Sequence, residues 1–132
     1  MKNKNKKNDV INNGTAVDLS VLERVLLLNI LPREGSIITL RMIRQLREKL
    51  SFDIDELKIL QFRNPGEEYF IGGVKGIVPE GQLVWNRGTS FEIKNIQFDK
   101  IEVETIMNSL KIMDEQERMN DELLNIYDKF RI

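Results

Sequence analysis

The chain has 132 residues, of which 41% are hydrophobic and 31% charged, a balance that predicts a compact globular domain. It contains neither cysteine nor histidine, which excludes disulfides, thiolate nucleophiles, Ser-His-Asp triads and the commonest zinc sites. The formal net charge is -1, so the chain as a whole is not strongly basic. This disfavours nonspecific binding to the phosphates of a nucleic acid.

The first residues form a basic, polar segment, and we expect residues 1–17 to be a flexible tail. Its lysines include Lys4, Lys6 and Lys7. No apolar run of signal-peptide type follows, and the longest apolar block, Val25 to Leu28, is far shorter than the roughly 20 residues of a membrane span. We therefore expect a cytoplasmic protein with no membrane partner, in which residues 18–132 form a single α+β domain.

Residues 18–62 have the spacing of three helices. Ser20 and Glu23 have the spacing of a capping box ahead of an apolar stretch, which predicts a helix that ends near Leu31, before Pro32. Its apolar residues cover most of the circumference. This helix should therefore be covered by neighbours on several sides.

The β-branched pair Ile37-Ile38 predicts a short strand, followed by Thr39 as a candidate cap for a second helix that runs to about Leu50. Apolar residues recur on one side of this helix at spacings of three and four. Three basic residues fall on the other side: Arg41, Arg44 and Arg47.

Ser51 or Asp53 is the expected cap of a third helix, whose first turn is acidic, as the helix dipole favours. Four apolar residues of this helix are expected in the core: Ile54, Leu57, Ile59 and Leu60.

Residues 67–96 change to a pattern of strands and turns. The strongest turn signal is Pro79-Glu80-Gly81, which predicts a hairpin that pairs residues 74–78 with 82–86. Gly72-Gly73 is expected to form a bulge or a second turn.

Residues 98–131 return to helical spacing and predict two further helices, the second capped by Asn120 or Asp121. Their apolar residues are Ile101, Ile106, Met107, Leu110, Met113, Leu123, Leu124, Tyr127 and Phe130. The aromatic residues Trp85, Tyr127 and Phe130 are candidates for interface anchors, although core positions are expected for Trp85 and Phe130.

The predicted fold class is α+β and mostly helical, with an N-terminal three-helix core and hairpin that resemble a winged helix, followed by two C-terminal helices. In a DNA-binding winged helix the third helix enters the major groove. Here the start of that helix carries Asp53, Asp55 and Glu56, the wrong charge to place against phosphates. We therefore favour protein contact over DNA contact.

Two groups of charged residues are candidates for binding. Acidic residues of the last third form the candidate protein-binding set, which is Glu102, Asp114, Glu115 and Glu117. The alternative nucleic-acid-binding set is basic and comprises Arg41, Arg44, Arg47, Lys4, Lys6 and Lys7. The acidic clusters lack the spacing of a calcium loop, and no cofactor or phosphate-binding loop is present in the sequence. We expect no catalytic residue, no metal, no cofactor and no enzyme activity.

Several short segments resemble small uncharacterised proteins encoded by bacteriophages and prophages of AT-rich bacteria. The matching segments are Leu26 to Gly35, Thr39-Leu40, Ile43, Leu46-Arg47, Trp85-Asn86 and Tyr127 to Phe130. This resemblance carries no known activity. It implies that the protein acts in the host-cell cytoplasm, where its partner would be a host protein or another phage protein.

The sequence thus favours a small phage-type protein–protein interaction module that binds or inhibits a host protein, such as a defence factor, through an acidic surface. Two alternatives are a winged-helix nucleic-acid-binding regulator and a structural subunit of a phage assembly. The sequence sets neither the oligomeric state nor the identity of the partner.

Overall fold

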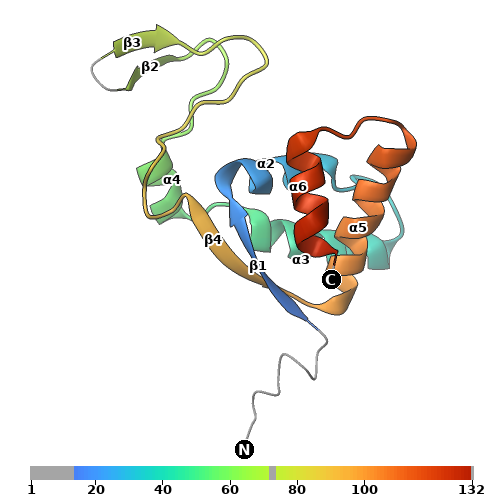
Figure 1. The fold of residues 1–132 in the computed structure, drawn as a ribbon. Helices are drawn as coiled ribbons and strands as arrows, with labels where there is room; N and C mark the ends of the chain where they lie inside the picture. The colour runs from blue at the N-terminus through green and yellow to red at the C-terminus, as the bar shows by residue number, and fades with distance from the viewer. Residues whose placement is uncertain (1–13, 72–73, 132) are drawn as a thin grey trace, which may run out of the picture. The chain divides into compact units, whose positions relative to one another are not determined.

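The computed structural model describes residues 14–71 and 74–131, and Figure 1 shows the order of their helices and strands. The fold is mixed α+β and mostly helical, as the sequence predicts. The expected single domain is divided into two compact units. The larger unit joins the chain up to Ser51 with the chain from Ile93, and the smaller unit is Phe52–Glu92.

The larger unit contains an antiparallel ribbon of β1 (Thr15–Ser20) and β4 (Ile93–Phe98). Val17 lies opposite Ile96 in the ribbon, and both side chains are buried, whereas the alternate residues of each strand face outward. The predicted tail boundary is therefore too late, because the last three residues assigned to the tail already belong to a paired strand.

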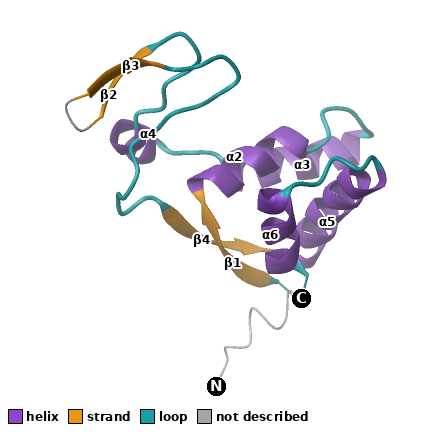
Figure 2. Cartoon of the chain, turned by 45° about the horizontal axis from the view of Figure 1, so that its top comes forward, coloured by secondary structure: helices purple, strands orange, loops and turns teal. Residues whose placement is uncertain are grey.

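Four helices of the larger unit pack together, and Figure 2 shows the ribbon along one flank of them. They are α2 (Val21–Ile30), α3 (Ile37–Leu50), α5 (Lys100–Glu115) and α6 (Asp121–Phe130). Their shared core is aliphatic with two phenylalanines, Phe98 and Phe130, whose ring centroids are 5.2 Å apart in an edge-to-face contact. The predicted core position of Phe130 is confirmed, since it is 1% exposed.

Helix starts follow the capping signals in the sequence, with one exception. The Ser20 hydroxyl accepts a hydrogen bond from the Glu23 amide, and the Glu23 carboxylate accepts one from the Ser20 amide, as predicted. Asn120 caps α6, which settles the choice between two expected caps. The exception is α3, which Ser36 caps, so Ile37 and Ile38 form its first turn and not a strand, and Thr39 lies inside the helix.

Two arginines join α2 and α3 by binding each other's C-terminal carbonyl groups. Arg24 of α2 is fully buried and donates to the carbonyl oxygens of Leu50 and Ser51 at the end of α3. Arg47 of α3 donates to the carbonyl oxygens of Leu28 (3.1 Å) and Leu31 (3.4 Å) at the end of α2. Because the last carbonyls of a helix lack partners within the helix, each arginine satisfies groups that the other helix leaves free.

The smaller unit contains α4 (Ile54–Leu60) and an antiparallel ribbon of β2 (Glu68–Ile71) and β3 (Val74–Ile77). Residues 74–77 thus pair with 68–71, and the predicted pairing with 82–86 is wrong. The turn signal itself is correct, since the Gln82 amide donates to the Pro79 carbonyl and Gly81 has a φ of 78°. The chain beyond this turn makes an isolated bridge, Arg63 to Val84. The Gly72-Gly73 prediction lies outside the described residues.

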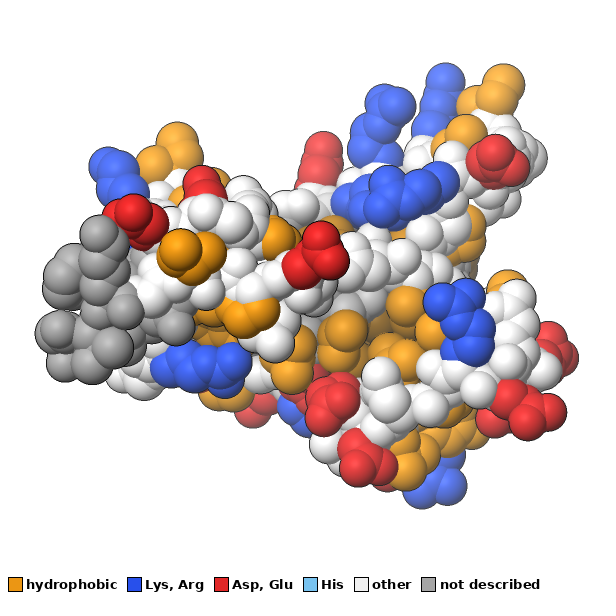
Figure 3. Space-filling view, turned by 90° about the horizontal axis from the view of Figure 1, so that it is seen from above, with side chains coloured by type: hydrophobic (Ala, Val, Ile, Leu, Met, Phe, Trp, Pro, Cys, Tyr) orange, Lys and Arg blue, Asp and Glu red, His pale blue; other side chains and the backbone are white. Residues whose placement is uncertain are grey.

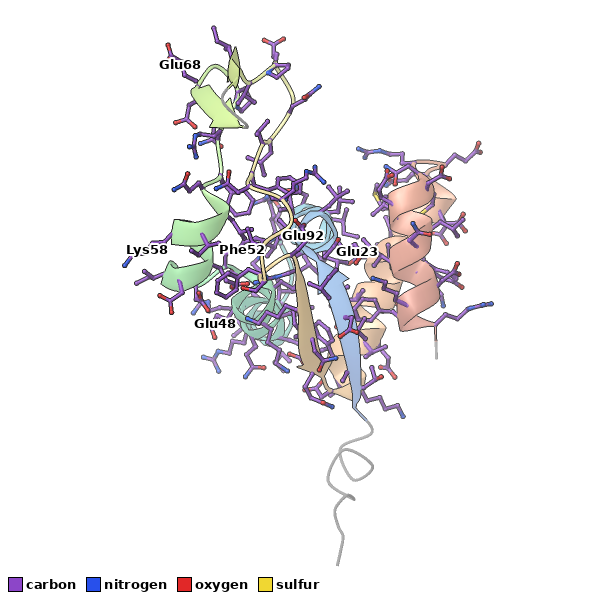
Figure 4. The ribbon with its side chains drawn as sticks, turned by 60° about the vertical axis from the view of Figure 1, so that its left-hand side comes forward. Glu23, Glu48, Phe52, Lys58, Glu68 and Glu92 are labelled. Atoms are coloured by element: carbon purple, nitrogen blue, oxygen red, sulfur yellow. The ribbon has the colours of Figure 1, made fainter. Side chains whose placement is uncertain are left out.

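The cap of α4 is Asp53, one of the two predicted, but most of the apolar residues expected in the core are exposed. Only Leu60 is buried, whereas three side chains are between 45% and 69% exposed: Ile54, Leu57 and Ile59. Glu56 is buried instead, because its carboxylate completes the capping box with the Asp53 amide. Figure 4 shows Lys58 pointing away from this helix.

The core of the smaller unit includes an aromatic cluster of Phe52, Phe62 and Trp85. Trp85 is 4% exposed, which confirms its predicted core position, and the Arg87 guanidinium lies 4.4 Å from its ring centroid. Among the described residues, no group accepts a hydrogen bond from the indole Nε1.

Candidate functional site

A hollow with an apolar floor lies between α5 and α6 in the larger unit, and we call it the α5–α6 groove. Its volume is about 440 Å³, and it is lined by Leu110, Lys111, Asp114, Glu115, Met119, Leu124 and Tyr127. Leu110 is buried at its base, while Leu124 on α6 is 49% exposed. Tyr127, a predicted candidate anchor, thus lies in this groove, at the surface of the core, and is half-buried.

The groove forms because both helices bury only one side. On α6 the core side carries Leu123, Ile126 and Phe130, which leaves Leu124 and Tyr127 on the adjoining side. On α5 the groove-lining residues that follow Leu110 are charged, namely Lys111, Asp114 and Glu115, so the apolar floor meets a charged rim. An apolar floor with a charged rim is typical of a surface that binds an amphipathic segment.

The rim of the groove is mainly acidic. Between residues 111 and 122 the sequence contains five Asp or Glu residues and two Lys or Arg residues. Asp114 and Glu115 line the groove, and Glu117, whose φ is 55°, follows them in the chain. Three of the four predicted protein-binding residues therefore lie close together, and all three are exposed.

These three acids stand at the C-terminal end of α5, and the last turn of this helix has no basic residue. The C-terminal end of a helix carries the negative pole of its dipole, where carboxylates are unfavourable by about 0.3–1 kcal/mol each. The helix dipole therefore does not explain the placement of these acids.

Glu102, the fourth predicted residue, does not belong to this surface. Its side chain is 2% exposed and forms a capping box with Asp99 at the start of α5. Its carboxylate also binds the Lys49 ammonium at 2.6 Å. Glu102 is therefore buried and paired in the structure, apart from the three exposed acids. The spacing of Asp99 and Glu102 already carried the signal, because it matches the capping pattern recognised at Ser20 and Glu23.

The predicted nucleic-acid-binding row is only partly available. Arg41 and Arg44 are exposed on α3, but Arg47 is half-buried and is engaged with the end of α2. A hollow of about 470 Å³, which we call the α3 hollow, is lined by Pro32, Arg33, Leu40, Ile43, Arg44 and Arg47. No acidic side chain lines it among the described residues. The predicted lysines Lys4, Lys6 and Lys7 lie outside the described residues.

The first turn of α3 exposes a group of apolar side chains, two of which, Ile37 and Ile38, were expected in a strand. Ile37 is 71% exposed, Ile38 is 79% exposed and Leu40 is 36% exposed. Beside them a smaller hollow is lined by Pro32, Ile38, Thr39, Met42, Ile43, Thr105, Asn108, Ser109 and Ile112. The signal that could have found this surface was Ser36, a helix cap directly before two isoleucines.

Figure 3 shows both kinds of surface on the right-hand part of the view, where hydrophobic side chains stand beside acidic side chains in one area and beside basic ones in another. No group of three or more acidic side chains in residues 14–71 and 74–131 could hold a metal ion. The helices in these ranges are also too short or too polar to cross a membrane.

No family model matches the chain, and no curated protein or solved structure is significantly similar to it.

Proposed function

We propose that this protein is a protein–protein interaction module that binds a basic, amphipathic segment of another protein in the α5–α6 groove. The observation that carries the proposal is the combination of an apolar floor with carboxylates at the C-terminal end of α5, where the helix dipole is negative. Apolar residues of the partner would cover Leu124 and Tyr127, and its basic residues would approach Asp114 and Glu115.

The same charges disfavour nucleic acid as the occupant of the groove. A phosphate brought to the C-terminal end of α5 would meet both the carboxylates and the negative pole of the helix. A basic protein segment has the opposite charge and can supply apolar side chains as well. The resemblance to small phage proteins makes a host protein the expected class of partner, and occupation of its basic surface is the mechanism by which binding would inhibit it.

Binding of a defined probe tests the proposal. The probe is a fluorescein-labelled helical peptide of leucine and lysine with one apolar face, and its control is the same pattern built from leucine and glutamate. We expect fluorescence anisotropy to show binding of the first peptide only. The double substitution Asp114→Lys and Glu115→Lys should weaken this binding at least about tenfold.

Glu48→Lys is the matched control, since it reverses one exposed acidic charge on α3, away from the groove (Figure 4). It should leave the affinity for the leucine–lysine peptide within about twofold of wild type. Equal binding of that peptide to wild type and to the groove variant would refute the groove as the site, and so would the absence of binding to either.

A second candidate function, nucleic-acid binding, is favoured by the three arginines that line the α3 hollow. In this proposal α2, α3 and α4 with the β2–β3 ribbon correspond to a winged helix, and phosphates contact Arg33 and Arg44. Its test is a gel shift with duplex DNA over a range of salt concentrations. A steep loss of affinity with salt supports it, and the absence of a shift at low salt removes it.

A further inference from the structure

The apolar first turn of α3 is a preorganised projection that the fold leaves uncovered. Its exposed apolar residues are Ile37, Ile38 and Leu40, and we call this group the α3 knob. The Ser36 hydroxyl accepts a hydrogen bond from the Thr39 amide at 3.1 Å, and the Ser36 carbonyl accepts one from the Leu40 amide at 2.9 Å, so the backbone of this turn is fixed. A contiguous group of exposed large apolar side chains marks an interaction surface.

The surroundings of the knob are basic. Arg33, Arg41 and Arg44 are exposed around it, and Glu34 is the one acidic residue in the sequence from Leu31 to Arg47. The first turn of α3 has no acidic residue, so the positive pole of this helix is not offset by its own side chains.

The knob and the α5–α6 groove are therefore complementary in three respects. One projects and the other is hollow, both offer apolar side chains, and their rims have opposite charge. The helix poles are complementary as well, because α3 presents its positive end and α5 its negative end.

Both surfaces can be used at once, because they lie on different sides of α5. The hollow beside the knob is lined by Asn108 and Ile112 of α5, whereas the groove is lined by Leu110 and Asp114. On a helix with 3.6 residues per turn these two pairs face roughly opposite directions. A molecule with an occupied groove thus still presents its knob.

We propose that the α3 knob of one copy inserts into the α5–α6 groove of a second copy. The contact joins two different surfaces, so it does not close after two subunits, and it produces head-to-tail chains or rings. This inference rests on the proposed function of the groove and names the same chain as a partner for it. Assembly would then keep the groove closed until a basic partner segment displaces the knob.

Sedimentation velocity over micromolar to millimolar protein concentrations tests the contact. Wild type should form species larger than a dimer as the concentration rises. Two variants should stay monomeric: Ile38→Glu, which lacks the knob, and Asp114→Lys with Glu115→Lys, which lacks the acidic rim. Ile101→Glu is the matched control, because Ile101 is 55% exposed on the first turn of α5, outside both surfaces, and this variant should assemble as wild type does.

Mixing the two monomeric variants gives the decisive result. The Ile38→Glu chain keeps a groove and the groove variant keeps a knob, so the mixture should form a 1:1 dimer and nothing larger. A mixture that stays monomeric overturns the inference, as does a wild type that stays monomeric or stops at a dimer. Circular dichroism of each variant checks that the helices are retained.

The leucine–lysine peptide separates this inference from the proposed function. Ile38→Glu should bind the peptide at least as tightly as wild type does, and excess peptide should dissociate wild-type assemblies. If the peptide binds but wild type never assembles, the inference fails and the proposed function stands. If the peptide fails to bind any form, including the monomeric Ile38→Glu variant, the proposed function fails.

Discussion

Replacement of Arg24 by methionine tests the reciprocal arginine contacts between α2 and α3. Arg24 is fully buried and donates to the carbonyl oxygens of Leu50 and Ser51. Methionine keeps an unbranched apolar chain in the same space but donates no hydrogen bond, so the two carbonyl groups lose this partner. The variant therefore isolates the polar part of the contact.

The expected loss of stability is about 3 kcal/mol. Hydrogen bonds from a charged donor contribute about 1.5–3 kcal/mol each, so two of them give about 3–6 kcal/mol. The lower end applies, because burial of the guanidinium costs free energy that the methionine variant no longer bears. With a urea dependence of about 2 kcal/mol per molar, the midpoint of unfolding should fall by about 1.5 M.

Urea unfolding followed by circular dichroism measures this shift, with Arg41→Met as the matched control. Arg41 is exposed on α3, and its replacement should change stability by less than about 0.5 kcal/mol. If Arg24→Met unfolds at the same urea concentration as Arg41→Met, the hydrogen bonds only balance the desolvation of the arginine, and the reasoning is refuted.

Three further substitutions follow from the structure. Phe130→Ala removes a ring that is 1% exposed and packed on Phe98, and it should cost about 3–5 kcal/mol in urea unfolding; a loss below about 1 kcal/mol would contradict the assigned core. Glu102→Ala should lower the free energy of unfolding by about 1–3 kcal/mol, because it breaks the α5 capping box, whereas Glu104→Ala, at an exposed position, should be nearly neutral. Equal urea midpoints for the two variants would contradict the burial of Glu102. Gly81 has a φ of 78°, and no atom lies in the way of an added Cβ, so Gly81→Ala tests backbone strain alone. We expect about 1–2 kcal/mol of strain and a lower thermal midpoint, and an unchanged midpoint would contradict this backbone conformation.

The helices could be predicted from the sequence because their caps are local signals. Ser20 with Glu23 and Asp53 with Glu56 each combine a short polar side chain with an acid three residues later, and both pairs form capping boxes. The strand at residues 15–20 carries a signal too, since Val17 and Leu19 alternate with polar or small residues, but its partner lies far along the chain.

Predictions failed where tertiary context decided between local options. Ile37 and Ile38 favour a strand by propensity, yet the cap at Ser36 starts a helix there and leaves both side chains exposed. The turn after Pro79 forms, but β3 pairs with the strand before it, which a turn signal alone does not determine.

Only the charged residues of the candidate site could be predicted from the sequence. Asp114 and Glu115 were identifiable as an acidic group at the end of a helix, but the apolar floor depends on how α6 packs against α5. The spacing of three places Arg47 on the same side of the helix as Arg41 and Arg44, in the alternative nucleic-acid-binding set. Its contacts with Leu28 and Leu31 depend on the crossing of two helices, which the spacing does not encode.

The β1–β4 ribbon has a consequence for the synthesis of the protein. Ser20 pairs with Ile93, so roughly 70 residues must leave the ribosome after β1 before its partner strand appears. At about 5–20 residues per second, β1 waits on the order of 4–15 seconds with Val17 and Leu19 uncovered by β4. During this time β1 has an unpaired edge that can pair with other nascent chains.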